Sequence, residues 1–539
     1  MRTPSAWLLV LTTAAVSQEP TRVKVRDIDL TTRDIYTIEQ AEGNLLYILA
    51  NLLHATTRDE VPRRELWFAP GDFVTREEVE EVERNLRAMR LFGEVSSNLT
   101  ANDDGTHDLA IRTRDRFTLS AQAGASAVGG VTKTSATLAE NNLFGTGKQV
   151  AVNFRAAADD RETYLRLTDP QLFGGWHRAN VIIGDSDHGP FFNVDVTRPF
   201  KHLADPYSYG IGGSYAEREV EYYLSGDSVA QVPEVRREVT TFAAHAFGPR
   251  DLRGSAGFEA RWRTSDYSPA KGSYASSIRV PGDTEEVRLG PTIGVDWRTH
   301  YEKVTGLDTL DYVEDLWFGV SAVVRPGLAL RDEVGRGSQT QPLLSGVLKA
   351  SVAPCASTYL TFETAGSARW HGGDAVGWKA FSALHAYQRS LPLQTLAASL
   401  TYEAEFETQD LPPQLTLGED NGLRGYPARE FAGTRVMRLN LEDRIDTGIT
   451  IWSVHVGAVA FTDVGWVHGD AQGLTMDSPI RSVGVGLRFG SSNLLGNRVV
   501  RLDFAWPLDE VGGTDYGMSI SASMGQVFGW FGNLAELKD

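Results

Sequence analysis

Over residues 117–530, apolar side chains alternate with small or polar ones, and this feature most constrains what the chain can fold into. The last such segment has apolar residues in one phase and serines in the other: Met518, Ile520, Ala522 and Met524 against Ser519, Ser521 and Ser523. A period of two residues places successive side chains on opposite faces of a β-strand. No run of about 18 apolar residues follows the N-terminus, which excludes a helical membrane protein.

Roughly twenty segments of this kind are separated by Gly, Asp, Asn and Pro. They begin near residues 117, 131, 147, 161, 177, 189, 207, 233, 251, 284, 316, 340, 356, 376, 394, 434, 450, 480, 497 and 516. Hydrocarbon tolerates no unpaired strand edge, so membrane-spanning strands must close, and bacterial barrels have an even number of strands. A soluble sandwich also alternates, but this much alternation behind an N-terminal secretion signal favours a transmembrane antiparallel β-barrel over residues 117–530.

The connections between these segments also tend to alternate in length. Short turns such as 248–250 and 353–356 contrast with longer polar loops such as 266–284 and 331–341. In bacterial barrels the short turns face the periplasm and the long loops face the exterior. The segment Tyr301–Asp315 breaks this rule, so the strand count stays open there.

The composition agrees with a barrel and excludes several other classes. The 52 basic and 70 acidic residues give a net charge of −18, without the clustered Lys and Arg that nucleic-acid binding requires. The 53 glycines suit turns and a crowded lumen, while the 12 Trp, 17 Tyr and 23 Phe suit the two membrane interfaces. The single cysteine, Cys355, allows no intramolecular disulfide and no cysteine-based metal cluster, and we expect it in a turn.

The N-terminus has the pattern of a secretory signal peptide. Residues 1–17 combine an early positive charge at Arg2, an apolar run from Ala6 to Val16 and a small residue, Ser17, before the expected cleavage near Gln18. The alternative is a buried first helix. No cysteine follows the expected cleavage site, which argues against a lipid-anchored start.

Residues 21–116 have a mixed α and β pattern. A helix over 45–53 is amphipathic, and a second helix starts at a capping box formed by Thr75 and Glu78. Val79, Val82, Leu86 and Met89 then recur at helical spacing, so one face of this helix should pack on a sheet. Two strands over 92–99 and 107–113 follow. A helix ending at 90–95 before a hairpin resembles the POTRA module of outer-membrane assembly proteins; another small α+β domain is the alternative.

Three separated motifs in the barrel region resemble one family. They are the turn Asn141–Lys148, the loop sequence Leu423-Arg424-Gly425-Tyr426, and the strand sequence Phe461-Thr462-Asp463-Val464-Gly465. They are similar to the early turn, the inward-folded loop and the inner-wall motif of BamA/TamA-type outer-membrane assembly and translocation proteins, with Leu423 in place of the common Val. The resemblance implies a barrel of sixteen strands, fewer than the segments counted, and it usually brings several POTRA modules where this chain has room for one.

The strand phases support a contact between the loop and the wall. Glu442 and Asp463 each lie in the polar phase of their strand and should face the lumen. The planar fork of Arg424 suits two such carboxylates in a way that Lys could not reproduce. By resemblance, we assign Arg424, Gly425, Tyr426, Glu442, Asp463 and Gly465 to an inward-loop lock.

The C-terminal segment resembles the signal by which assembly machinery recognises a barrel. Its pattern consists of Ser523, Gly525, Phe528 and Trp530, and the tail 531–539 follows it, whereas such signals usually end the chain. We expect the closing strand over 516–528 to meet the first strand, over 117–127. Strand glycines contribute little packing, so Gly124, Gly517 and Gly525 should weaken this seam.

No sequence pattern points to catalysis. The chain lacks a nucleophile elbow, a phosphate loop and clustered His ligands, so we expect no enzyme, cofactor or metal. The resemblance implies a factor in the bacterial outer membrane, with its N-terminal domain in the periplasm, that inserts or translocates unfolded outer-membrane or secreted proteins. Implied partners are these clients, the bilayer with its lipopolysaccharide, and periplasmic accessory proteins, but not nucleic acid. The alternatives are a two-partner-secretion exporter of one dedicated protein and a passive pore.

Overall fold

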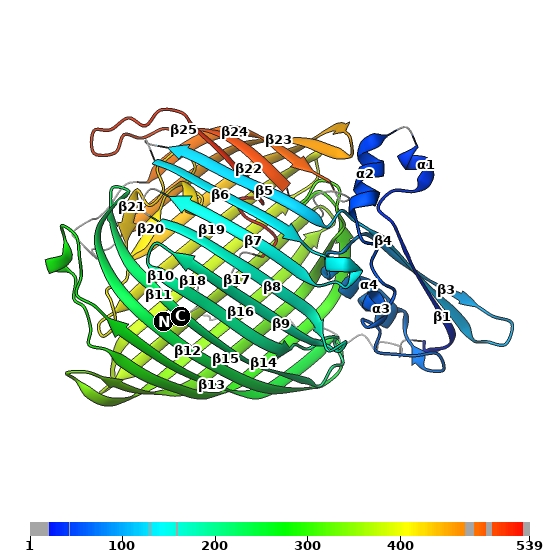
Figure 1. The fold of residues 1–539 in the computed structure, drawn as a ribbon, viewed down its shortest axis with the longest axis horizontal. Helices are drawn as coiled ribbons and strands as arrows, with labels where there is room; N and C mark the ends of the chain where they lie inside the picture. Colours follow the sequence, from blue (N-terminus) through cyan, green and yellow to red (C-terminus); the bar gives the residue numbers. More distant parts are fainter. Residues whose placement is uncertain are drawn as a thin grey trace, which may run out of the picture.

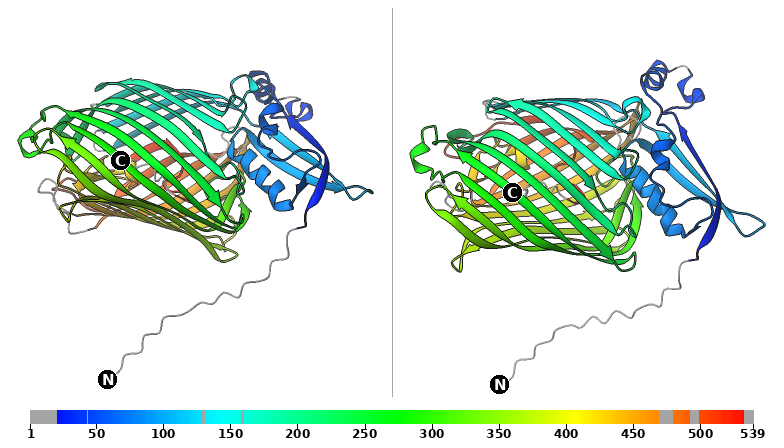
Figure 2. Two further views of the ribbon diagram at one scale, coloured as in Figure 1. Left: turned by 90° about the horizontal axis from the view of Figure 1, so that it is seen from below. Right: turned by 60° about the horizontal axis from the view of Figure 1, so that its bottom comes forward.

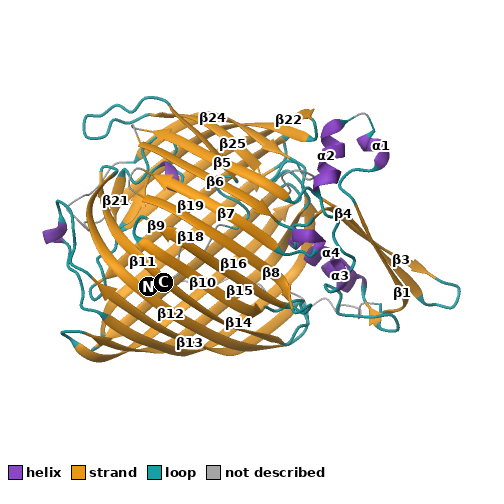
Figure 3. Cartoon of the chain, in the orientation of Figure 1, coloured by secondary structure: helices purple, strands orange, loops and turns teal. Residues whose placement is uncertain are grey.

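The computed structural model describes residues 21–42, 44–128, 131–157, 160–468, 479–491 and 499–531. The expected signal peptide, residues 1–17, lies outside the described residues, as does the tail beyond residue 531. Figures 1 and 2 show a small N-terminal domain beside one end of a large β-barrel. Figure 3 shows that most of the helical segments lie in this N-terminal domain.

The N-terminal domain contains a four-stranded sheet in the order β2-β1-β4-β3. Its strands are β1 (Val23–Arg33), β2 (Phe73–Val74), β3 (Phe92–Ala101) and β4 (His107–Asp115), and its helices are α1 (Ile38–Ala41), α2 (Leu45–Leu53), α3 (Glu60–Arg63) and α4 (Arg76–Ala88). β1 runs parallel to β4, and β3 pairs with β4 as an antiparallel hairpin. The domain is thus α+β, and its assignment as a POTRA module stays a prediction.

Helix α4 begins where the sequence predicts. The Thr75 side chain accepts a hydrogen bond from the Glu78 backbone, and the Glu78 side chain accepts one from the Thr75 backbone, so the capping box is confirmed. The apolar side chains at helical spacing, Val79, Val82 and Leu86, are buried in one core with the inner face of the sheet.

The barrel is closed by twenty antiparallel strands. They are β5 (Leu119–Val128), β6 (Val131–Glu140), β7 (Gln149–Ala157), β8 (Asp160–Leu172), β9 (His177–Ser186), β10 (Gly189–Arg198), β11 (Tyr207–Leu224), β12 (Asp227–Phe247), β13 (Leu252–Tyr267), β14 (Thr284–Val304), β15 (Glu314–Glu333), β16 (Gly337–Cys355), β17 (Thr358–His371), β18 (Asp374–Gln388), β19 (Gln394–Glu407), β22 (Arg435–Ile451), β23 (Val454–His468), β24 (Ile480–Gly490), β25 (Val499–Pro507) and β26 (Ser519–Met524). The closed antiparallel barrel and the count of twenty are therefore confirmed. The sixteen strands implied by resemblance are wrong, because three short motifs cannot count strands whereas the alternation does.

We call the barrel end beside the N-terminal domain the near end, and the opposite end the far end. The long segment 305–313, which broke the expected alternation of loop lengths, joins β14 to β15 at the near end and turns into the barrel, where Leu307 is buried. The expected long loop 331–341 is wrong. Its polar residues continue the two strands, and only 334–336 lie between β15 and β16.

The barrel wall is apolar outside and polar inside. In β24 the exposed phase includes Val483, Val485 and Leu487, while Ser482 and Arg488 are buried in the opposite phase. This arrangement suits a barrel surrounded by hydrocarbon. No helix among the described residues is long and apolar enough to cross a membrane.

Helix α4 ties the N-terminal domain to the near end. The Nε and Nη2 atoms of Arg87 donate to the two carboxylate oxygens of Asp315 at the start of β15, at 2.6 and 2.7 Å. Lys303 at the end of β14 donates to Glu83 at 2.6 Å. Burial alone would lower the pKa of Arg87, but Asp315 and Glu83 outweigh it and raise this pKa above its usual value. Arg87 therefore stays charged, and the two ion pairs fix the domain against the barrel.

Candidate functional site

The long connection between β19 and β22, residues 408–434, is a folded segment that we call the inward loop. It contains the short strands β20 (Leu415–Leu417) and β21 (Phe431–Gly433) and a helical turn, Glu419–Asn421. Its apolar side chains form a core with side chains at the far ends of β22, β23 and β24. The loop contributes Leu417, Leu423, Tyr426 and Phe431, and the strands contribute Val436, Val467 and Ile480. The loop therefore packs against the wall near the far end.

Arg424, in this loop, is 1% exposed and makes the central contact with the wall. Its Nε and Nη2 donate to the two carboxylate oxygens of Asp463, both at 2.8 Å, and its Nη1 donates to Glu442 at 2.8 Å. The Arg424 guanidinium also lies 3.4 Å from the centre of the Phe461 ring. A planar fork is needed to make these contacts at once, which the point charge of Lys does not provide.

The carboxylates face Arg424 because β22 and β23 place them in the inner phase. Asn440 fixes Asp463 through a hydrogen bond of 2.7 Å, and Arg444 fixes the second oxygen of Glu442 at 2.9 Å. Burial lowers the pKa of Arg424, but Asp463 and Glu442 more than compensate, so this pKa lies above its usual value. The Arg424 side chain therefore stays charged while buried.

Three further residues assigned to the lock, Gly425, Tyr426 and Gly465, shape the contact between the loop and the wall. A Cβ at Gly465 would lie 2.5 Å from Leu417, so glycine is required where the loop meets β23. Gly425 has a φ of +99°, in the left-handed region that favours glycine. The buried hydroxyl of Tyr426 donates to the carbonyl of Arg481 at 2.9 Å. All six residues predicted for the lock thus lie around one contact, and their functional role stays a prediction.

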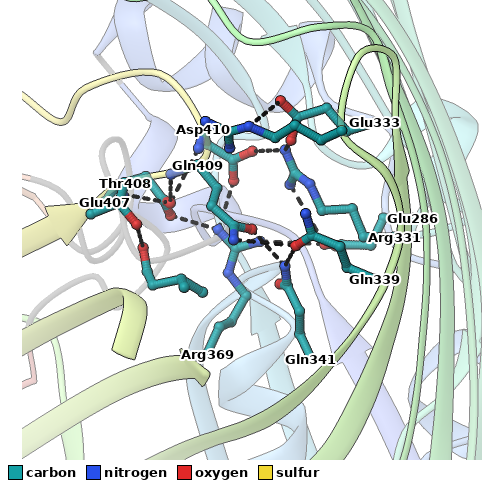
Figure 4. A network of polar contacts seen from close by, with 12 residues as sticks. Glu286, Arg331, Glu333, Gln339, Gln341, Arg369, Glu407, Thr408, Gln409 and Asp410 are labelled. Carbon is teal, nitrogen blue, oxygen red and sulfur yellow. Dashed lines mark hydrogen bonds and ion pairs between the residues drawn. The ribbon is translucent and has the colours of Figure 1, made fainter. Parts of the chain in front are cut away.

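A second anchor, which sequence reasoning missed, holds the start of the inward loop against β15 and β17 (Figure 4). Asp410 accepts a hydrogen bond of 2.7 Å from Arg369 in β17 and forms an ion pair of 2.7 Å with Arg331 in β15. Gln409 accepts a hydrogen bond of 2.6 Å from Gln341. Burial raises the pKa of Asp410, but Arg369 and Arg331 outweigh it and hold this pKa below its usual value.

The strand phase was the only sequence signal for this second anchor. Arg331 and Arg369 lie in the inner phase of β15 and β17, but the sequence predicts a loop over 331–341 and therefore does not place Arg331 in the lumen. Asp410 lies in a loop without a regular period, and no pattern connects it to these arginines.

The seam where the barrel closes is short. β26 pairs with β5 at three positions, Ile520 with Ala127, Ser521 with Ser126 and Ala522 with Ala125. By contrast, β5 shares ten residue pairs with β6 on its other side.

The closing strand, expected over 516–528, is shorter: β26 spans only Ser519–Met524. Gly517 precedes β26, and Gly525 follows it with a φ of +88°, which turns the chain away from the wall. Phe528 and Trp530 then lie inside the near end instead of extending the strand. Ser523 remains in β26, where its hydroxyl accepts a hydrogen bond from Arg501. Their part in opening the seam stays a prediction.

Gly124 lies in the part of β5 beyond the three seam pairs. A Cβ there would approach the Ser135 hydroxyl on β6 to 2.8 Å, so a larger residue would disturb the contact with β6.

The turned-in C-terminal segment, residues 525–531, closes the near end together with segment 305–313. Asp308 accepts a hydrogen bond of 2.6 Å from the Trp530 backbone, and Arg444 donates to the Phe528 carbonyl at 3.0 Å. Phe528 packs in one core with Leu307 and with side chains of the opposite wall. Burial raises the pKa of Asp308 in spite of the nearby Arg444. Both ends of the lumen are therefore obstructed by segments of the chain itself.

No family model and no curated protein matches the sequence. Among solved structures, the chain is similar to a BamA from Haemophilus ducreyi lacking POTRA domains 1–3, with 13% identity, a TM-score of 0.40, and coverage of 93% of this chain and 84% of that one. It is similar to CdiB from Acinetobacter baumannii, with 12% identity, a TM-score of 0.45 and coverage of 93% and 74%. It is also similar to CdiB from Escherichia coli, with 11% identity, a TM-score of 0.46 and coverage of 96% and 94%. These are barrels of the kind that the motifs resemble, but such distant likenesses carry no argument about the activity of this chain.

Replacement of Arg424 should weaken the barrel strongly. In Arg424→Ala, Asp463 loses the cation with which it forms its buried ion pair, whereas Glu442 keeps its contact with Arg444. Breaking a buried pair in this way costs about 3–5 kcal/mol. Arg424→Lys should also destabilise, because Lys lacks the fork. The temperature at which the purified barrel loses its heat-modifiable band on SDS gels measures the effect. Arg481→Ala, at an exposed ion pair with Asp509, is the matched control. An unchanged transition in Arg424→Ala would contradict the structural importance of the contact.

Replacement of Asp410 should release the start of the inward loop. The depressed pKa of Asp410 means that the anchor contributes fully above the usual pKa of an aspartate and is lost only as the pH falls through the lower, folded-state value. Planar-bilayer recordings of the wild type should therefore stay quiet at mildly acidic pH, whereas Asp410→Asn should show frequent open events at every pH. Asp374→Asn, at the exposed far-end start of β18, should behave as the wild type. Equal opening in the two variants would count against the anchor.

Proposed function

We propose that this protein is an assembly or translocation factor of the BamA/TamA type in the bacterial outer membrane, with its N-terminal domain in the periplasm. The observation that carries the proposal is the three-pair seam between β5 and β26. Residues 119–124 of β5 lie beyond these pairs and offer backbone groups to another strand. An unpaired edge is costly in hydrocarbon, so a client strand that adds to it is stabilised.

The N-terminal domain offers a second edge for client strands. β2 pairs with β1 at Val23 and Lys24, which leaves most of that edge of β1 without a neighbouring strand in the sheet. An extended client segment can bind there by β-augmentation. The ion pairs of α4 with β14 and β15 hold this domain at the near end, on the side from which a periplasmic client would arrive.

The contents of the lumen bear on two alternative functions, a dedicated exporter and a passive pore. A polar cavity of about 330 Å³ lies between the inward loop and the wall around Arg369, and it favours export of a dedicated protein through the barrel as the second candidate. A passive pore is less well supported, because the inward loop and residues 525–531 obstruct the lumen. Among the described residues, no group of three or more His, Cys, Asp or Glu side chains is arranged to hold a metal ion. We propose neither a cofactor nor an enzymatic activity.

The proposed partners are unfolded outer-membrane or secreted proteins, the bilayer with its lipopolysaccharide, and periplasmic accessory proteins. Depleting the protein and measuring the outer-membrane and secreted proteomes separates the candidates. Broad loss of barrel proteins supports the assembly factor, and loss of one secreted protein supports the exporter. An unchanged proteome would overturn both.

A disulfide across the seam should block activity. In a Cys355→Ser background, Ser126→Cys and Ser521→Cys stand opposite each other and should cross-link on oxidation. Because the seam must part for a client strand to enter, the oxidised protein reconstituted in vesicles should fail to insert a client barrel, and reduction should restore insertion.

The matched control is a second cysteine pair at Ser120 and Ala139, which are opposite each other in the β5–β6 hairpin. This pair should cross-link without loss of insertion, since the hairpin need not open. Full insertion by the protein locked at the seam would rule out seam opening.

A further inference from the structure

Helix α2 exposes an apolar surface that no described part of the chain covers. Its sequence, Leu-Leu-Tyr-Ile-Leu-Ala-Asn-Leu-Leu over 45–53, contains no charged residue. Together with Ile38 of α1, its apolar side chains are exposed to the following extents: Ile38 79%, Leu45 68%, Ile48 46%, Leu49 38%, Leu52 75% and Leu53 63%. Contiguous apolar patches of this kind on an otherwise polar domain mark an interaction surface.

The rest of the N-terminal domain does not share this character. The solvent face of α4 carries Arg76, Glu77 and Glu80, and its apolar side chains are turned onto the sheet. Elsewhere in the described part of the domain, Phe73 of β2 is the one large apolar side chain that is exposed. The contiguous apolar surface is therefore specific to α1 and α2.

The position of α2 relates this surface to the seam. The Tyr47 hydroxyl forms a hydrogen bond of 2.7 Å with Ser453, in the near-end turn between β22 and β23. Ala50 packs in one cluster with Tyr36 and with Phe117, just before β5. β24, β25 and β26 lie between these two contacts in the order of the barrel. Figure 1 shows α2 beside the near ends of β22 and β23, in agreement with these contacts.

The apolar outer surface of the barrel continues toward α2. Ile449, Ile451 and Trp452 are 53%, 54% and 70% exposed and lead along β22 into the turn that contacts Tyr47. Other near-end turns also carry exposed apolar tips at positive φ: Phe144, Phe173 and Leu393. A rim of apolar and aromatic side chains at one end of a barrel suits the boundary between hydrocarbon and water.

We propose that the apolar face of α1 and α2 inserts into the lipid leaflet at the near end, beside the seam. This inference rests on the membrane-embedded barrel of the proposed function. The occupant of the surface is lipid, since α2 carries no charged residue and lies beside the apolar outer surface of the barrel at Ile451 and Trp452. A helix with one apolar face lies in the plane of such an interface. It would border the place where a client strand enters the bilayer.

Fluorescence of the full chain in lipid vesicles tests this insertion. In a Cys355→Ser background, an environment-sensitive fluorophore is attached to Leu45→Cys or Leu52→Cys, and the protein is reconstituted in phosphatidylethanolamine and phosphatidylglycerol, with or without brominated acyl chains. Leu441→Cys, on the outer face of β22, reports the lipid environment, and Glu77→Cys, on the exposed face of α4, reports water. Labels at 45 and 52 should be blue-shifted and quenched by bromine as at 441, whereas the label at 77 should not.

The other outcomes overturn the inference in distinguishable ways. Labels at 45 and 52 that behave as at 77, with quenching at 441, place the face in water and leave the barrel proposal intact. Shielding that requires added unfolded client, or that rises with protein concentration, identifies a client or a second copy as the occupant instead of lipid. Absence of quenching at 441 would overturn the membrane-embedded barrel itself.

Discussion

A β-strand edge in hydrocarbon must have its backbone groups paired, and the structure of the barrel depends on this constraint. Nineteen of the twenty neighbouring strand pairs meet it through extended ladders, for instance the ten residue pairs of β5 with β6. The remaining one, β26 with β5, has three residue pairs. The least stable line of the wall is therefore fixed by the length of β26, six residues. The chain leaves the wall at Gly525 although more apolar residues follow.

The lumen obeys a second constraint, since charges removed from water must be compensated. The inward loop carries a cation to an acidic wall, Arg424 to Asp463 and Glu442, and an anion to a basic wall, Asp410 to Arg331 and Arg369. Without the loop, Asp463 would lose its ion-pair partner, whereas Arg331 and Arg369 would keep contacts with carboxylates of the strands, Glu286, Glu333 and Glu407. Without the wall, both Arg424 and Asp410 would lose their partners. The loop therefore depends on the wall at both anchors, and the opposite charges of the two anchors determine which end of the loop contacts which part of the wall.

Much of this architecture was predictable because a period of two fixes the face of every strand residue. This period gave the strand count and the lumenal placement of Glu442 and Asp463, while the capping box of Thr75 and Glu78 gave the start of α4. The period could not predict contacts made by loops or by residues that are distant in the sequence. Phe528 and Trp530 alternate as strand residues do, but partners distant in the sequence, Asp308 and Arg444, hold them in the lumen. The same limit hid the contact of Asp410 with Arg369, and it hid the fact that the amphipathic helix over 45–53 leaves its apolar face uncovered.

Three of these features meet at the near part of the seam. Residues 119–124 of β5 lie beyond the seam pairs there, residues 525–531 turn into the lumen beside them, and α2 spans from the turn at Ser453 to Phe117 outside them. The far part of the seam has the paired residues. Separation of β5 from β26 therefore costs least if it begins at the near end, where the fewest backbone hydrogen bonds must break. That end also faces the N-terminal domain, so the unpaired part of the β5 edge lies on the same side of the barrel as the open edge of β1.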